Sequence, residues 1–196
     1  MIAEVTGVIL AGGASSRFGS NKALAVHDGK SLISSVAATL ERLFPQRLLI
    51  TNDPETYAFL GWPSLGDYFK GAGPLAGIHA ALGGINTPCA FITGCDMPFL
   101  SEELIRLLAE LASSGDWDVV VPCPGGRPEP LYAIYHRRCL PTIEASLRRE
   151  ERKIGLVLKS LKVRRVAESE LLSVLPDLGT FLNVNRPGDL PSCGTV

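Results

Sequence analysis

The chain has 196 residues, a formal net charge of −1, and 46% hydrophobic against 20% charged residues. These proportions are typical of a globular protein with a full hydrophobic core and argue against a disordered chain. A net charge near zero provides no global basic field for nucleic acid or for a membrane surface. We therefore expect neither as a partner, and any preference for anions must come from a local site.

The five cysteines are scattered along the chain, odd in number, and form no C-x-x-C pair. This pattern argues against a disulfide scaffold or a zinc site and is typical of a reducing compartment. The amino terminus lacks the basic and long apolar regions of a secretion signal, and no stretch approaches the roughly 20 apolar residues of a membrane span. These features predict a cytoplasmic protein.

Short apolar runs alternate with helical patterns along the first half of the chain. The run Val5–Leu10 is nearly continuous and predicts a strand buried on both faces. Apolar residues at helical spacing after Ser31, a candidate N-cap, predict a helix as far as Leu43. Residues 47–51 predict a second strand, and residues 74–82 a helix with proline in its first turn.

The second half continues this alternation. Strands are predicted at 89–94, 118–121, 131–135, 161–166 and 181–184, and helices at 101–111 and 137–149. The whole pattern predicts an α/β fold, a single Rossmann-like domain with a mainly parallel sheet flanked by helices. We expect the domain to cover residues 1–190 and residues 191–196 to form a flexible tail.

A glycine-rich segment follows the first predicted strand, where ligands bind in open α/β sheets. It reads Leu10-Ala11-Gly12-Gly13-Ala14-Ser15-Ser16-Arg17-Phe18-Gly19, with Lys22 just beyond. Its spacing matches neither the Walker A motif nor the dinucleotide G-x-G-x-x-G. Glycines alone are equally consistent with a simple turn. Arg17, which offers a bidentate fork, and Lys22, a mobile point charge, favour a triphosphate site.

Five segments in the same order resemble the molybdenum cofactor guanylyltransferase (MobA) family, within the nucleotide-diphospho-sugar-type transferases. They are L-A-G-G-x-S-x-R-F-G-x-x-K, Asp67 with 73–78, 94–100, 129–135 and 181–190. The resemblance spans nearly the whole chain. It implies a magnesium-dependent guanylyltransferase that moves GMP from GTP to the terminal phosphate of molybdopterin, forming molybdopterin guanine dinucleotide and releasing pyrophosphate.

The resemblance also implies a role for individual residues. Arg17, Lys22 and Asp96 are the expected catalytic residues, with Asp96 the Mg²⁺ ligand. Nucleotide contacts are expected from Leu10, Ala11, Gly12, Gly13, Lys22, Asn52, Asp67, Gly73, Gly77 and Asp96. The acceptor phosphate is expected near Arg127, Asn183 and Asn185.

The preference for guanine depends on Asp67 and Gly12. A carboxylate accepts two hydrogen bonds from the N1–H and 2-amino groups of guanine, a pair that adenine does not offer. Cytidylyltransferases tend to have alanine where this chain has Gly12, and a missing methyl group leaves room for a bicyclic base, at about 1–3 kcal/mol of discrimination. For Asn52 and Asp67 a purely structural role in turns is the alternative.

Other interpretations stay open at this point. A molybdopterin cytidylyltransferase, or another nucleotidyltransferase with a small phosphorylated acceptor, is the nearest alternative enzyme, and a non-catalytic nucleotide-binding protein is the alternative of a different class. Arg186, where the family commonly has threonine, either adds charge near the acceptor or marks a different acceptor. Proteins that deliver the cofactor or accept it are the candidate protein partners. The basic residues Arg148, Arg149, Arg152 and Lys153 favour a solvated helix face over a ligand site.

Overall fold

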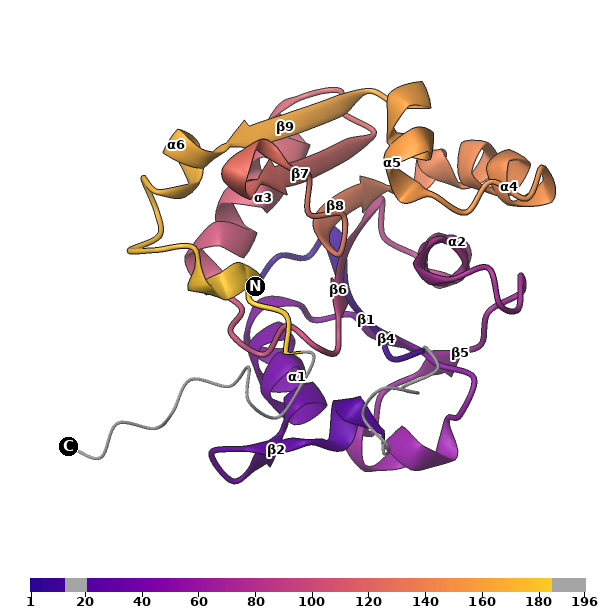
Figure 1. Cartoon of the computed structure of the whole chain (residues 1–196), viewed down its shortest axis with the longest axis vertical. Coiled ribbons are helices and arrows are strands. Elements are labelled where there is room, and N and C mark those ends of the chain that lie inside the picture. The colour runs from indigo at the N-terminus through magenta and orange to yellow at the C-terminus, as the bar shows by residue number, and fades with distance from the viewer. Residues whose placement is uncertain (13–20, 185–196) are drawn as a thin grey trace.

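The computed structural model describes residues 1–12 and 21–184 (Figure 1). A seven-stranded sheet forms its centre, in the order β5-β4-β1-β6-β8-β7-β9. These strands are β1 (Val5–Leu10), β4 (Arg47–Ile50), β5 (Ser64–Leu65), β6 (Cys89–Gly94), β7 (Val119–Cys123), β8 (Tyr132–His136) and β9 (Val163–Ala167). The pairings within this sheet are parallel except the two made by β8, with β6 and with β7. The predicted α/β fold with a mainly parallel sheet is confirmed.

Helices cover both faces of the sheet, which explains why β1 is apolar along its whole length. Its residues Val5 and Ile9 lie in the core beneath α1 (Leu32–Leu43) and α3 (Glu102–Ser114). Val8 and Leu10 lie in the core on the other face, beneath α2 (Pro74–Gly84), α4 (Leu140–Arg148) and α5 (Ile154–Val157). Figure 1 shows these two helical layers on opposite sides of the sheet, with α6 (Glu168–Leu171) beside β9.

The predicted helix starts are set by local hydrogen bonds. The side chains of Ser31 and Ser101 accept hydrogen bonds from the backbone N–H groups of Ser34 and Leu104, at 3.3 and 3.2 Å. These bonds satisfy donors that the first turn of a helix leaves without a partner. The sequence therefore located the beginnings of α1 and α3 correctly.

The strand predicted at 181–184 is wrong. A 3₁₀ turn covers Gly179–Phe181, and Leu182 N–H closes onto the carbonyl of Gly179. Val184 N–H then makes a single backbone bond of 2.9 Å to the carbonyl of Asp96. The backbone groups of this segment form the 3₁₀ turn and a single hydrogen bond to Asp96, so the segment does not pair with a neighbouring strand.

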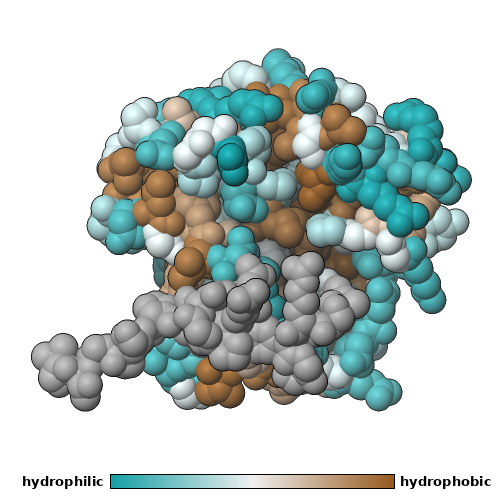
Figure 2. Space-filling view, in the orientation of Figure 1, coloured by the Kyte–Doolittle hydropathy of each residue, from teal (hydrophilic) through white to brown (hydrophobic). Residues whose placement is uncertain are grey.

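The helix predicted at 137–149 is divided, and the basic residues Arg148, Arg149, Arg152 and Lys153 do not share one helix face. Arg137–Cys139 form a 3₁₀ turn before α4, and Glu150 takes a left-handed conformation with φ of 61° after it. Arg148 ends α4 and bonds to Glu144 at 3.0 Å, while Arg152 lies in the connection to α5 and donates to the carbonyl of Gly71 at 3.3 Å. Hydrophilic residues cover the side of the molecule where α4 and α5 lie (Figure 2).

Several short elements were not predicted. They are the hairpin of β2 (Val26–His27) and β3 (Lys30–Ser31), the edge strand β5, and the 3₁₀ helices η1 (Lys22–Leu24) and η2 (Glu55–Leu60). The predicted tail at 191–196 lies outside the described residues. In the described part of the chain, no helix is long and apolar enough to cross a membrane.

The topology brings several loops to one edge of the sheet. Leu10 pairs with Ile50 of β4 and with Gly94 of β6, so β1, β4 and β6 end side by side. Because β8 is antiparallel to β6, its first residue Tyr132 lies opposite Thr93, near the end of β6. The segments after β1, β4 and β6, and the one before β8, therefore border this carboxyl edge. It is the edge at which open α/β sheets bind ligands.

Candidate active site

Asp96 and Lys22 form an ion pair at the carboxyl edge. Asp96 lies two residues beyond β6, and its Oδ2 is 2.9 Å from Nζ of Lys22 in η1. The side chains of Lys22 and Asp96 are 16% and 28% exposed, so both are shielded but still open to solvent. A carboxylate and an ammonium group predicted to act on one substrate thus lie in contact.

Lys22 belongs to a short helix whose start is fixed by Asn21. The Asn21 side chain accepts a hydrogen bond from Ala23 N at 3.1 Å and donates one to the hydroxyl of Tyr57 at 2.9 Å. Tyr57 is buried, and burial raises the pKa of its hydroxyl. The backbone that carries Lys22 is therefore anchored to η2, although the helix itself has only three residues.

Gly94 makes room for the carboxylate of Asp96. A Cβ atom on Gly94 would overlap Oδ1 of Asp96, so the side chain of Asp96 folds back over the end of β6. The next residue, Cys95, donates its N–H to the carbonyl of Leu10 at 3.2 Å, which ties this turn to the end of β1. Burial, with the nearby charge of Asp96, raises the pKa of the Cys95 thiol to about 12. Cys95 is therefore a neutral packing residue at neutral pH and not a nucleophile.

Asn52 and Asp67 meet at the same edge, on the side of β4 and β5. Asn52 Nδ2 donates to Asp67 Oδ2 at 3.2 Å, and Asp67 N–H donates to Asn52 Oδ1 at 3.0 Å. Asn52 is exposed and Asp67 is half-buried. The two residues were predicted separately as nucleotide contacts, and the structure brings them together.

The small residues predicted to contact the nucleotide have distinct structural roles. Gly73 has φ of 73°, the left-handed region that favours glycine, and immediately precedes Pro74 at the start of α2. Gly77 packs against β1, since a Cβ atom there would lie 3.2 Å from both methyl carbons of Leu10. At Gly12 a Cβ atom would have no described atom within 4 Å.

Leu10 and Ala11 have buried side chains, at 8% and 6% exposure. Ala11 N–H is occupied by the carbonyl of Ile50 at 2.8 Å. Any nucleotide contact from this pair would therefore have to involve other backbone groups.

Two of the predicted acceptor residues, Asn183 and Arg127, also lie along the carboxyl edge. Asn183 immediately precedes Val184, whose N–H bonds to the backbone carbonyl of Asp96. Arg127 is exposed in the loop between β7 and β8, and its N–H donates to the carbonyl of Pro124 at 3.1 Å. Three of the predicted residues, Gly13, Arg17 and Asn185, lie outside the described residues.

Glu129 is a further acidic residue at this edge that sequence reasoning did not single out. Its backbone N–H bonds to the carbonyl of Pro122, and its Oε1 accepts from Leu131 N at 3.3 Å. Burial raises the pKa of the Glu129 carboxyl, and the negative charge of Asp96 raises it further. The signal in the sequence was an acid between two prolines, directly before a strand that borders the edge.

The donor set at Asp96 fits a magnesium ion. Mg²⁺ usually keeps several waters and binds one or two carboxylates together with substrate phosphates. Residues 1–12 and 21–184 contain no group of three or more His, Cys, Asp or Glu that forms a protein-only metal cage. A single partly exposed carboxylate beside a lysine is therefore suited to a metal that arrives with a triphosphate.

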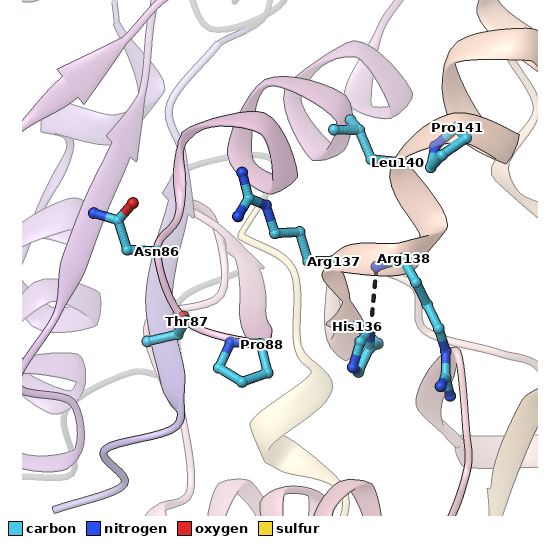
Figure 3. A pocket seen from close by; sticks show the side chains of 8 residues that line it. All are labelled: Asn86, Thr87, Pro88, His136, Arg137, Arg138, Leu140 and Pro141. Carbon is cyan, nitrogen blue, oxygen red and sulfur yellow. Dashed lines mark hydrogen bonds between the residues drawn. The ribbon is translucent and has the colours of Figure 1, made fainter.

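An open hollow of about 520 Å³ lies at the opposite edge of the sheet, where β6 begins and β8 ends. Figure 3 shows the side chains that line it. It is lined by Asn86, Thr87, Pro88, His136, Arg137, Arg138, Leu140 and Pro141. In Figure 3 the imidazole Nδ1 of His136 accepts a hydrogen bond of 3.1 Å from Arg138 N. None of the predicted site residues lines this hollow, so it is not the candidate active site.

Comparisons with known proteins identify the family. Residues 7–166 match the family model described as a MobA-like NTP transferase domain. The chain is 40% identical over 189 residues to a molybdenum cofactor guanylyltransferase of Desulfosudis oleivorans, covering 95% of this chain and 92% of that one. It is 39% identical over 186 residues to a probable molybdenum cofactor guanylyltransferase of Carboxydothermus hydrogenoformans, covering 95% and 93%.

A solved structure gives the same result at the level of the fold. The chain resembles molybdopterin-guanine dinucleotide biosynthesis protein A from Archaeoglobus fulgidus, with a TM-score of 0.83, 28% sequence identity, and 94% of each chain covered. The likeness extends over nearly the whole of both chains and concerns the fold.

Proposed function

The chain belongs to the MobA-like NTP transferase family, and on that premise we propose that it transfers GMP from GTP to the terminal phosphate of molybdopterin. The products are molybdopterin guanine dinucleotide and pyrophosphate. The names of its relatives support both the nucleotide and the acceptor.

The observation that carries the proposal is the Lys22–Asp96 pair at the carboxyl edge, with a 2.9 Å separation. Nucleotidyl transfer needs positive charge near the α-phosphate and the leaving pyrophosphate, because negative charge increases there in the transition state. Lys22 supplies such a charge, and its contact with Asp96 keeps the ammonium group at the edge before the substrate arrives. Arg17 is proposed to assist as a second cationic group, in line with the family resemblance.

In the proposed reaction an oxygen of the acceptor phosphate attacks the α-phosphorus of GTP. A new P–O bond forms, the bond from the α-phosphorus to the bridging oxygen breaks, and pyrophosphate leaves with the bonding electrons. The acceptor phosphate is already ionised near neutral pH, so no side chain has to remove a proton. The histidines are consistent with this: His27 packs against Phe99 at 5.7 Å between ring centroids, and His79 packs against Phe69 at 5.0 Å.

Magnesium dependence is part of the proposal. Asp96 is the residue that would hold Mg²⁺, and the ion would supply charge neutralisation on the phosphates when bound. Lys22 would then exchange its contact with Asp96 for one with a phosphate oxygen. Asp67 would accept hydrogen bonds from the N1–H and 2-amino groups of guanine, and Arg127, Asn183 and Asn185 would face the acceptor.

A cytoplasmic location also belongs to the proposal. The cysteines at 89, 95, 123 and 139 are free thiols, as is usual in a reducing compartment. Proteins that deliver molybdopterin or receive the product are the proposed protein partners.

The test is an assay with purified molybdopterin, Mg²⁺, and GTP, CTP or ATP in separate reactions. We expect pyrophosphate release and a molybdopterin dinucleotide with GTP, and little of either with CTP or ATP. Preference for CTP would replace the guanylyl assignment by a cytidylyl one. Binding of GTP without pyrophosphate release, with the acceptor present, would instead indicate a nucleotide-binding protein without this activity.

A further inference from the structure

Asn52 contacts Asp67 with both ends of its side-chain amide. Its Nδ2 donates to the carboxylate Oδ2 at 3.2 Å, and its Oδ1 accepts from the backbone N–H of Asp67 at 3.0 Å. This pairing needs one donor and one acceptor in a short planar group, which asparagine provides. The amide therefore holds the backbone and the carboxylate of Asp67 at once.

The surrounding chain is built to keep this contact. Thr51 N–H bonds to the carbonyl of Leu65 at 2.8 Å, which continues the β4–β5 pairing up to the two residues. Thr51 Oγ1 accepts from Asp53 N at 3.1 Å and closes the turn around Asn52. Gly66 lies between β5 and Asp67, and a Cβ atom there would come within 3.0 Å of Asn52 Oδ1. Glycine at position 66 thus allows the segment after β5 to lie close to Asn52 at the end of β4.

The contact restricts the carboxylate that is proposed to select guanine. To accept from both N1–H and the 2-amino group, the carboxylate has to lie in the plane of the base. Asp67 is half-buried and Asn52 is exposed, so without a partner the carboxylate would rotate and exchange hydrogen bonds with water. Fixing it before the nucleotide binds reduces the ordering cost of binding.

We infer that Asn52 is a positioning residue, which orients Asp67 for guanine and acts on the nucleotide only through Asp67. This inference rests on the proposed function. It differs from the expectation that Asn52 itself contacts the nucleotide, because a direct contact would contribute to binding whether or not Asp67 is present.

A double-mutant cycle separates the two roles. Binding of GTP and of ITP, which lacks the 2-amino group, is measured by calorimetry with Mg²⁺ for the full chain and for Asn52→Ala, Asp67→Ala and the double variant. We expect Asn52→Ala to weaken GTP binding about tenfold and to reduce the preference for GTP over ITP. In the Asp67→Ala background the same substitution should have no further effect, so the coupling should equal the whole single effect.

Two further variants act as controls. Asp53→Ala removes an exposed side chain from the same turn, one that bonds to Thr56 and not to Asp67, so it should leave the GTP to ITP ratio unchanged. Asn52→Asp keeps the shape but replaces the Nδ2 donor by an oxygen that repels Asp67, so it should lower the ratio at least as much as Asn52→Ala.

The outcomes that contradict the inference are distinct. Additive effects of the two substitutions, with the GTP preference of the unaltered chain intact, would overturn the positioning role and restore a direct contact. Failure of the unaltered chain to bind GTP in preference to CTP and ITP would overturn the proposed function, and this inference with it.

Discussion

Nζ of Lys22 lies 2.9 Å from Oδ2 of Asp96, although 74 residues separate the two in the sequence. The first residue belongs to a three-residue helix and the second to the turn after a buried strand. Lys22 is the cation expected to contact the phosphates, and Asp96 is the carboxylate expected to bind the metal. Because the two side chains are in contact, a change at either residue should affect the same nucleotidyl-transfer step.

Lys22→Ala should weaken GTP binding and reduce kcat/KM by about 100-fold, because a positive charge at the leaving phosphates is lost. Calorimetry and a pyrophosphate-release assay measure the two effects. Lys30→Ala, which removes an exposed lysine from β3, is the matched control and should leave both unchanged. Equal kinetics in Lys22→Ala and the unaltered chain would exclude Lys22 from the site.

Asp96→Asn should reduce magnesium-dependent turnover by at least about 100-fold while the protein stays folded, since the amide keeps the shape but not the charge that attracts the cation. Circular dichroism checks the fold, and turnover is followed as Mg²⁺ is titrated. Asp28→Asn makes the same change at an exposed turn position with φ of 49°, which asparagine tolerates, so its turnover should be normal. Undiminished turnover of Asp96→Asn would remove the metal assignment.

Gly94→Ala should impair activity by displacing Asp96, because the added methyl group would overlap Oδ1 of that residue. Crowding of this kind costs typically about 1–3 kcal/mol of stability, so we expect a folded protein with a lower melting temperature and turnover reduced about tenfold or more. In α2, Gly83→Ala introduces a methyl group into open space and serves as the control. If Gly94→Ala turns over GTP normally, the position of the Asp96 carboxylate is not critical.

Glu129→Gln should change how stability depends on pH. The folded-state pKa of Glu129 is raised above its ordinary value of 4.5, so the carboxyl stabilises the fold below pH 4.5, and this contribution is lost as the pH rises through the raised value. The variant cannot ionise there, so its free energy of unfolding should increase relative to the unaltered chain as the pH rises above 4.5. Urea denaturation across this range measures the difference.

Glu103→Gln provides a control of opposite sign for that experiment. Hydrogen bonds from its own backbone N–H and from Ser101 lower the pKa of Glu103. Removing this carboxylate should therefore reduce stability more at about pH 7 than at acidic pH, by a small amount because the side chain is exposed. If the free energy of unfolding changes with pH in the same way in both variants, the raised pKa of Glu129 does not contribute to the pH dependence of stability.

Long, strongly patterned elements of this fold could be predicted from sequence alone. The apolar run of β1 and the serine N-caps of α1 and α3 each act locally, so the sequence carries their signal directly. The direction of β8 could not be predicted, because an apolar run of five residues is the same in either direction. The error at 181–184 has the same origin: a short apolar segment reads as a strand, but only tertiary contacts decide whether its backbone groups find a ladder.

Smaller elements had weaker signals. Asp28-Gly29, with φ of 49° and 75°, makes the turn of the β2–β3 hairpin, and such a dipeptide favours this turn. The flanking strands have only two residues each, too few for a periodic pattern to emerge. In the site, the resemblance named Lys22, Asn52, Asp67 and Asp96, but which of them touch depends on the order of the strands.

The β6–β8 pairing also divides the sheet into two parts, each formed by one continuous stretch of the chain. The four strands on one side of the β6–β8 pairing all come from residues before 95, and the three on the other side all come from residues after 118. The predicted nucleotide residues fall in the first group, except Asp96, which directly follows it, and the predicted acceptor residues fall in the second. A single genetic crossover within α3 would thus exchange one half of the sheet as a block. Such an exchange would keep the predicted nucleotide residues before β6 together and replace the predicted acceptor residues.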